Sequence, residues 1–121
     1  MKSVWTLQID RDVQGDVLIL ALRGRLGTAS AGDLLEAVVQ AIDDGGFRAI
    51  LVDLEGVDYM SSAGLIALDA SAGRIHGAGG RLAVSGACDP VRLVLEFGEL
   101  TKDVPIEPSR AAGLERLRSS L

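Results

Sequence analysis

Two apolar runs separated by an amphipathic segment constrain the fold of this chain more than any other feature. Residues 17–22 (VLILAL) and 49–52 (AILV) are continuous aliphatic runs, which are typical of strands covered on both faces. Between them, apolar residues recur at spacings of one and of three to four, the pattern of a helix with one buried face: Leu34, Leu35, Val38, Val39 and Ile42. Gly45 and Gly46 end this helix. The segment predicts a β-α-β crossover between two central strands.

The residues before this unit predict one further strand. Trp5, Leu7 and Ile9 alternate with polar residues, as they do in a strand that is buried on one face. The polar segment 12–16 contains a glycine and predicts a hairpin turn into the run at 17–22.

The second half of the chain repeats the alternation of helices and strands. A helix is expected from about Ser62 to His76, and a strand at residues 82–84. Asp89 and Pro90 predict the start of a short helix. Aspartate accepts bonds from free backbone N–H groups, and proline at the first helical position has no N–H to satisfy.

The C-terminal segment predicts a last strand and a last helix. Residues 104–106 (VPI) fit a strand at a sheet edge, because proline cannot donate to a ladder. Ser109 opens a helix that Gly113 weakens by about 1 kcal/mol relative to alanine, with three leucines on one face: Leu114, Leu117 and Leu121. The order β-β-α-β-α-β-α-β-α predicts a single-domain α/β fold, with a mostly parallel sheet of about five strands and about four helices.

Length, composition and charge narrow the class of protein. A chain of 121 residues with 48% hydrophobic and 24% charged residues is expected to fold as one globular domain. The longest aliphatic run is far shorter than the roughly 20 residues that span a bilayer, and the N-terminus lacks a secretory apolar segment. We therefore expect a cytoplasmic protein without membrane insertion. The net charge of −5 disfavours nucleic acid as a partner. The single cysteine, Cys88, is expected to fill the core.

Two adjacent serines in the segment Met60–Leu65 (MSSAGL) follow the second apolar run and open a predicted helix. They fit a serine nucleophile, a helix N-cap or a site of modification. A nucleophile needs a base, and the only histidine, His76, lies about 14 residues further along the same helix, or about 20 Å away. Local pattern alone favours Ser62 as an N-cap. A phosphate on Ser62 would also be held by free N–H groups and the helix dipole.

Other candidate groups have simpler structural interpretations. Asp53 and Asp58 flank the serines and could do acid-base work or hold magnesium, but fit a strand end and the turn after it. The glycine-rich segment 76–80 lacks the Gly-Lys-Ser/Thr ending of a phosphate loop and lies between a helix and a strand, so it predicts a helix stop and turn. We expect no catalytic site, metal or cofactor.

Several segments together resemble the STAS family of small bacterial anti-sigma factor antagonists, which also occurs as a domain of anion transporters. These are residues 24–26 (GRL) with Thr28, 50–54 (ILVDL), 57–65 (VDYMSSAGL) and 79–82 (GGRL). The resemblance covers nearly the whole chain and implies one STAS domain over residues 1–121. Two positions depart from the family pattern, because Gly27 and Ser61 stand where many members carry aspartate.

The resemblance implies a non-enzymatic, partner-switching regulator of transcription. Its unphosphorylated form would bind an anti-sigma factor with a histidine-kinase-like ATP fold and release the sigma factor. That partner, which holds the ATP and magnesium, would phosphorylate Ser62, and a serine phosphatase would reset the switch. By the same resemblance, the partner-binding residues are Thr28, Met60, Ser61, Ala63, Gly64 and Leu65.

Three alternatives stay open at this point. Thr28 fits equally well as the cap of a helix that begins near Ala29. The chain could be a non-switching STAS subunit of a signalling scaffold or of a lipid or anion transporter complex. Nucleotide binding by the domain itself is possible for the fold, but no motif supports it. We expect mostly monomer in dilute solution, because the chain is acidic and lacks heptads.

Overall fold

An antiparallel hairpin forms one edge of the sheet. β1 (Leu7–Gln14) pairs with β2 (Val17–Leu26) through a two-residue turn. Gly15 in this turn has φ of 61°, a left-handed conformation that glycine adopts without steric cost. The turn predicted over residues 12–16 was too long, because the first three of those residues belong to β1 and pair with β2.

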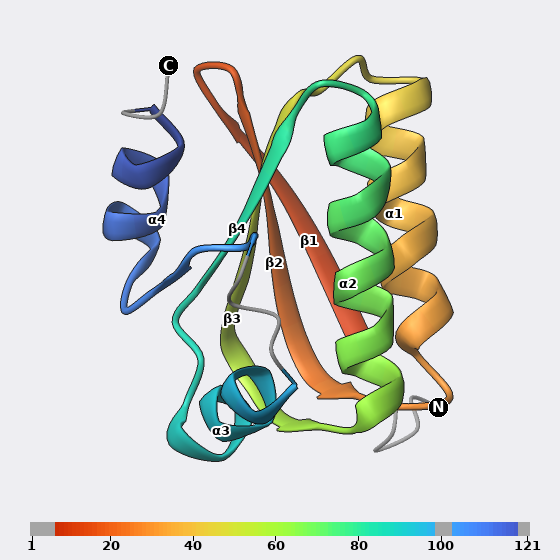
Figure 1. Cartoon of the computed structure of the whole chain (residues 1–121), viewed down its shortest axis with the longest axis vertical. Helices are drawn as coiled ribbons and strands as arrows, with labels where there is room; N and C mark the ends of the chain where they lie inside the picture. The colour runs from red at the N-terminus through yellow and green to blue at the C-terminus, as the bar shows by residue number, and fades with distance from the viewer. Residues whose placement is uncertain (1–6, 99–102, 119–121) are drawn as a thin grey trace.

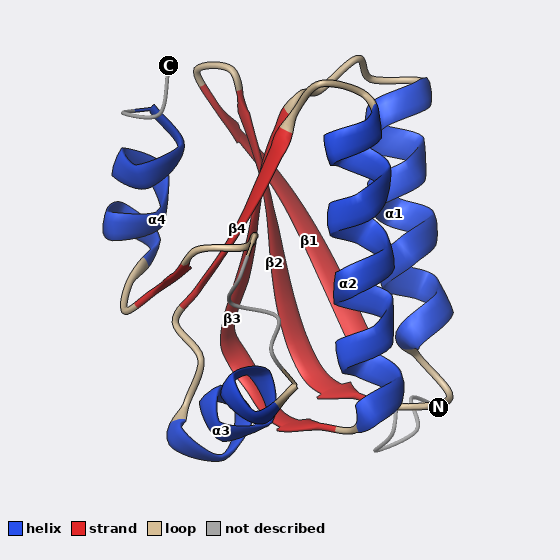
Figure 2. Ribbon diagram, in the orientation of Figure 1, coloured by secondary structure: helices blue, strands red, loops and turns tan. Residues whose placement is uncertain are grey.

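Parallel pairing builds the rest of the sheet. The computed structural model describes residues 7–98 and 103–118, and its strand order is β1-β2-β3-β4-β5 (Figure 2). β3 (Ala49–Met60) lies parallel to β2 and β4 (Arg81–Ser85), and β5 (Ile106–Glu107) is parallel to β4 at the far edge. The prediction of a mostly parallel sheet is confirmed.

β3 extends eight residues beyond the four-residue apolar run that predicted it. Its first half lies between β2 and β4, whereas its second half, from Gly56 to Met60, pairs with β2 alone. Asp58 is therefore an exposed strand residue, and its prediction in a turn was wrong. Asp53 lies inside β3, at the last position that pairs with β4. The longer strand carries the serine pair to the carboxyl end of the sheet.

The helices cover the two faces unequally (Figure 1). α1 (Ala31–Asp43) and α2 (Ser62–Gly77) pack together on one face, and α4 (Arg110–Arg118) lies on the other. α3 (Asp89–Phe97) lies at the end of the sheet, close to the beginning of α2. The element order and the helix stop before β4 are as the sequence predicts.

Most of the core fills the space between the sheet and the pair α1 and α2. Its fully buried side chains include Leu20, Leu34, Val52 and Leu68. Burying one such side chain stabilises the fold by about 1.5–3 kcal/mol. Successive side chains of a central strand point to opposite faces of the sheet, and helices cover both faces. This explains why the central strands are continuous apolar runs in the sequence rather than alternating apolar and polar residues.

A smaller core lies beneath α4, where Leu114 and Leu117 contact Ile19 and Leu51. Gly113 is buried in this contact, and a Cβ there would lie 2.6 Å from Leu51 Cδ1. The glycine therefore does more than weaken the helix, because it allows α4 to approach β3 closely.

The starts of the two C-terminal helices test the predicted caps. The backbone of Ala112 donates to Ser109 Oγ at 3.1 Å, so the predicted cap of α4 is confirmed. At α3 the N-cap is Cys88, one residue earlier than expected, and Asp89 is the first helical residue. Cys88 is exposed, so its prediction as core filler was wrong. Among predicted positions, Trp5 and Leu121 lie outside the described residues.

Candidate functional site

The serine pair forms the junction between β3 and α2. Met60 is the last residue of β3 and Ser62 the first of α2, with Ser61 in extended conformation (φ −95°, ψ 174°) between them. The N–H of Ser61 donates to the carbonyl of Leu26 at 3.0 Å, which attaches the junction to the end of β2. Ser61, and not Ser62, therefore occupies the N-cap position. It makes no side-chain cap hydrogen bond.

The two hydroxyl groups have different surroundings. Ser62 is exposed. The Oγ of Ser61 is buried, and it has no hydrogen-bond partner within the part of the chain that the structure describes. A modifying enzyme must reach the oxygen that it modifies, and of the two serines only Ser62 is an exposed residue.

The residues around the junction divide into a buried and an accessible group. Met60 and Gly64 are buried. A Cβ on Gly64 would lie only 2.6 Å from the Leu26 carbonyl oxygen, so the first turn of α2 rests directly on the end of β2. Ala63 and Leu65 are half-buried. Met60 and Gly64 therefore lie beneath the surface of the junction, whereas Ala63 and Leu65 form part of that surface.

The loop between β2 and α1 lies beside the junction. Thr28 in this loop is exposed, and α1 begins only at Ala31, so Thr28 is not the helix cap. Ser30 occupies the cap position, where its Oγ donates to the carbonyl of Arg25 at 2.7 Å and accepts from the N–H of Gly27 at 3.1 Å. These bonds fix the loop that presents Thr28.

α3, whose C-terminal end contacts α2, carries exposed apolar side chains that the sequence did not point to. Gly98 packs against Leu65 in the first turn of α2. Close to this contact, Phe97 is 84% exposed, Ile66 68% and Leu93 49%. Leu93 and Phe97 share one face of α3, since they lie four residues apart. In the sequence their spacing matches that of core residues, so no local signal marks them as exposed.

The other candidate chemical groups lie apart from Ser62. His76 is in the last turn of α2, at the opposite end of the helix. Asp53 is buried, and Arg110 donates to its Oδ2 from Nη2 at 2.8 Å and from Nε at 2.9 Å. Asp58 is exposed on β3. The described residues contain no group of three or more histidine, cysteine, aspartate or glutamate side chains able to hold a metal ion.

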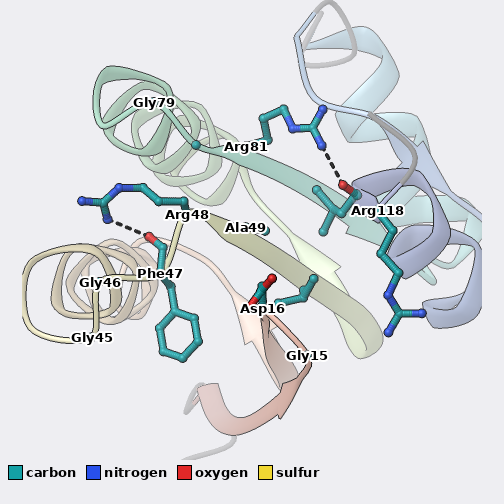
Figure 3. Close-up of a pocket in the computed structure, with 13 residues that line it drawn as sticks. Gly15, Asp16, Gly45, Gly46, Phe47, Arg48, Ala49, Gly79, Arg81 and Arg118 are labelled. Atoms are coloured by element: carbon teal, nitrogen blue, oxygen red, sulfur yellow. Dashed lines mark hydrogen bonds between the residues drawn. The ribbon is translucent and has the colours of Figure 1, made fainter. Parts of the chain in front are cut away.

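A large cavity of about 940 Å³ lies at the opposite end of the sheet, at the amino ends of the parallel strands (Figure 3). Three glycine-containing turns border it. Two of its three arginines donate to backbone carbonyls: Arg48 to Phe47 at 2.9 Å and Arg81 to Leu117 at 2.7 Å. These contacts stabilise the end of the sheet, far from the junction that holds Ser62.

Fold and site together define an α/β sandwich domain that presents a serine at the carboxyl end of its central sheet. A sequence model of the STAS domain matches residues 8–113, and the chain belongs to the STAS domain family. The resemblance in the strand and serine motifs is thereby confirmed. No helix within residues 7–98 and 103–118 is long and apolar enough to cross a membrane.

Related proteins extend this assignment. BtrV of Bordetella bronchiseptica, named as an anti-sigma factor antagonist, is 30% identical over 115 residues, which cover 95% of this chain and 98% of BtrV. An anti-sigma factor antagonist from Mycobacterium paratuberculosis superposes with a TM-score of 0.86 at 20% identity, over 98% of this chain and 100% of that one. The Bacillus cell fate determinant SpoIIAA in its phosphorylated form gives 0.70 at 18% identity, over 93% and 100%. The two structures share the fold of this chain.

Proposed function

We propose that this chain is an anti-sigma factor antagonist that acts by binding and not by catalysis. Its unphosphorylated form binds an anti-sigma factor with a histidine-kinase-like ATP fold, and this binding releases the sigma factor. The observation that carries the proposal is the exposed Ser62 in the first turn of α2, at the sheet end where α/β proteins bind partners. Membership of the STAS family and the name of BtrV support the same function.

The switch is phosphorylation of Ser62 by the partner. The Ser62 Oγ attacks the γ-phosphorus of the ATP held by the partner, and the bond from that phosphorus to the β–γ bridging oxygen breaks. ADP is the leaving group, and the Oγ proton passes to a base of the partner kinase. The phosphate adds about −1.5 to −2 charges to a serine that is neutral before modification. Free N–H groups in the first turn of α2 and the positive end of its dipole hold this charge without unfolding the domain.

The docking surface consists of accessible residues around Ser62. It includes Thr28, Ala63 and Leu65, and we extend it to Ile66, which lies one helical turn beyond Ser62 on the same face of α2. This surface is partly apolar. A doubly charged group placed on it must be desolvated when a partner docks, and removing such a charge from water costs several kcal/mol. Phosphorylation therefore releases the partner.

The remaining parts of the proposal concern the surroundings of the switch. ATP and magnesium belong to the partner kinase, and a serine phosphatase resets the switch. The chain itself carries no cofactor, works in the cytoplasm, forms one domain over residues 1–121 and is mostly a monomer when alone.

Site mapping tests the proposal directly. The chain is incubated with its cognate anti-sigma factor and ATP, and phosphorylated residues are identified by mass spectrometry. One phosphate on Ser62 is expected, and Ser61→Ala serves as the matched control that still accepts it. Ser62→Ala should accept none, yet should bind the partner and stay bound in ATP. Ser62→Asp should weaken binding partially, because one carboxylate copies a doubly charged phosphate poorly.

Two outcomes contradict the proposal. Phosphate found on Ser61 would move the switch to the buried hydroxyl. Stable binding without any phosphorylation would instead make the chain a non-switching subunit of a scaffold or transporter complex.

A further inference from the structure

A cavity of about 260 Å³ lies beside the junction between β3 and α2. The end of β2, the loop after it and the end of β3 line this cavity: Arg25, Gly27, Thr28, Ala29, Ser30, Tyr59 and Ser61. A cavity needs only about 10–15 Å³ to hold one water molecule, so this one has room for a side chain. Ser62 is not part of the lining. The cavity is therefore separate from the proposed site of phosphorylation, although it adjoins that site.

Ser61 lacks a hydrogen-bond partner in this cavity. Its Oγ is buried, lines the cavity and has no partner within residues 7–98 and 103–118. A buried hydroxyl in this state is unfavourable, because the hydrogen bonds that it makes with water in the unfolded chain are lost. A group that enters the cavity and accepts the hydrogen bond of Ser61 removes this penalty.

Gly27 leaves the space in front of this hydroxyl open. A Cβ on Gly27 would lie 3.6 Å from the Tyr59 ring and 3.7 Å from Ser61 Oγ, which are ordinary contact distances. The φ of Gly27 is not positive, so a larger residue can adopt its backbone conformation. A side chain at position 27 would therefore fit and would occupy the cavity from within the chain. The glycine instead leaves the cavity to a group from outside.

The lining favours a neutral polar group. It contains no carboxylate to pair with a lysine or an arginine, and such a cation would lie beside Arg25. Arg25 stacks on the Tyr59 ring, with its guanidinium carbon 4.4 Å from the ring centre, and makes a further interaction within the chain. It is thus not free to neutralise a buried carboxylate. An amide needs no counter-charge, because the hydroxyls of Ser61 and Thr28 both donate and accept.

We propose that this cavity is a recognition pocket for one asparagine or glutamine side chain of the anti-sigma factor, whose amide oxygen accepts the hydrogen bond of Ser61. The inference rests on the proposed function, because the occupant belongs to that partner. A partner that contacts Ser62 also reaches the pocket, since the Cα atoms of Ser61 and Ser62 are about 3.8 Å apart. A partner without the amide leaves the Ser61 hydroxyl unpaired, so the pocket selects among partners.

Isothermal titration calorimetry of the full chain with its cognate anti-sigma factor tests the pocket. Gly27→Leu fills the cavity and should weaken binding at least about tenfold, and Gly27→Ala, which leaves most of it open, should weaken binding less. Ser61→Ala removes the donor and should weaken binding about tenfold, while Ser62 still accepts phosphate at saturating partner. Gly73→Leu is the matched control, because Gly73 is exposed on α2 and open space surrounds it. It should bind like the unmodified chain.

A second measurement needs no partner. Gly27→Asn places an amide in the cavity from the chain itself, within reach of Ser61 Oγ. Compared with Gly27→Ala, it should raise the midpoint of urea unfolding, and this rise should vanish when Ser61 is also replaced by alanine. Gly27→Asn should also weaken partner binding at least about tenfold, because the chain then fills its own pocket. This variant keeps the inference testable if circular dichroism shows that Gly27→Leu does not fold.

The proposal is overturned if Gly27→Asn and Ser61→Ala bind the anti-sigma factor as tightly as the unmodified chain does. It is also overturned if Gly73→Leu loses as much affinity as Gly27→Leu, or if the rise in the urea midpoint persists without the Ser61 hydroxyl. Failure of the unmodified chain to bind an anti-sigma factor would instead refute the proposed function. The two failures are therefore distinguishable.

Discussion

The same substitution at two glycines of α2 should have opposite effects on stability. Gly64 is buried against the end of β2, where a Cβ would lie 2.6 Å from the Leu26 carbonyl oxygen and 2.8 Å from Leu26 Cγ. Gly73 is exposed in the middle of the helix, and nothing lies within 4 Å of the place where its Cβ would be. Gly64→Ala should therefore destabilise the fold, and Gly73→Ala should stabilise it.

The expected changes in the free energy of unfolding follow from two contributions, helix propensity and packing. Alanine is favoured over glycine inside a helix by about 1 kcal/mol, and this term alone applies to Gly73→Ala. At Gly64 the new methyl group meets a backbone oxygen that accepts the N–H of Ser61, so the helix must move away from β2. Such overpacking costs about 1–3 kcal/mol, which leaves a net loss of up to about 2 kcal/mol after the gain in helix propensity.

Urea unfolding followed by far-ultraviolet circular dichroism measures both effects. The free energy of unfolding should rise for Gly73→Ala and fall for Gly64→Ala, with the same dependence on urea concentration. The two variants should differ by about 1–3 kcal/mol. Equal stability of the two variants would refute the close packing of α2 against β2 that positions the serine junction.

Three further predictions address caps, ion pairs and assembly. Ser109→Ala should cost about 1 kcal/mol in the same unfolding assay, because it removes a cap hydrogen bond, whereas Ser61→Ala should cost far less. Arg110→Ala should cost about 1–3 kcal/mol, because it removes the cationic partner of Asp53, whose side chain is only 4% exposed. Arg23→Ala should change stability by less than about 1 kcal/mol, because both side chains of its ion pair are more than half exposed. Analytical ultracentrifugation should show mostly monomer, and a stable large oligomer would favour a scaffold subunit.

The sequence predicts the order of elements because hydrophobic period distinguishes helices from strands. It does not predict their lengths. The second half of β3 pairs with β2 alone, so most of its residues, including Asp58, are exposed, and it lacks the apolar signal of a buried strand. The hairpin turn was placed over too many residues for a related reason, since the end of β1 is exposed and polar.

The sequence predicts the serine motif of the site but not the three-dimensional arrangement of its two serines. Residue type alone does not decide which of two adjacent serines takes the N-cap position, and here the hydrogen bond from Ser61 to Leu26 decides it. The burial of one hydroxyl and the exposure of the other follow from that choice. Cys88 and Phe97 are exposed for tertiary reasons, because α3 lies at the end of the sheet and covers no full face.

The affinity of the chain for its anti-sigma factor tests the switch most directly. Isothermal titration calorimetry compares the chain with unmodified Ser62, the chain with phosphoserine at that position and Ser62→Ala. The phosphorylated chain should bind at least about tenfold more weakly, a loss of about 1.4 kcal/mol or more, while Ser62→Ala should bind as tightly as the unmodified chain. Equal affinity of all three forms would contradict the assignment of Ser62 as the switch.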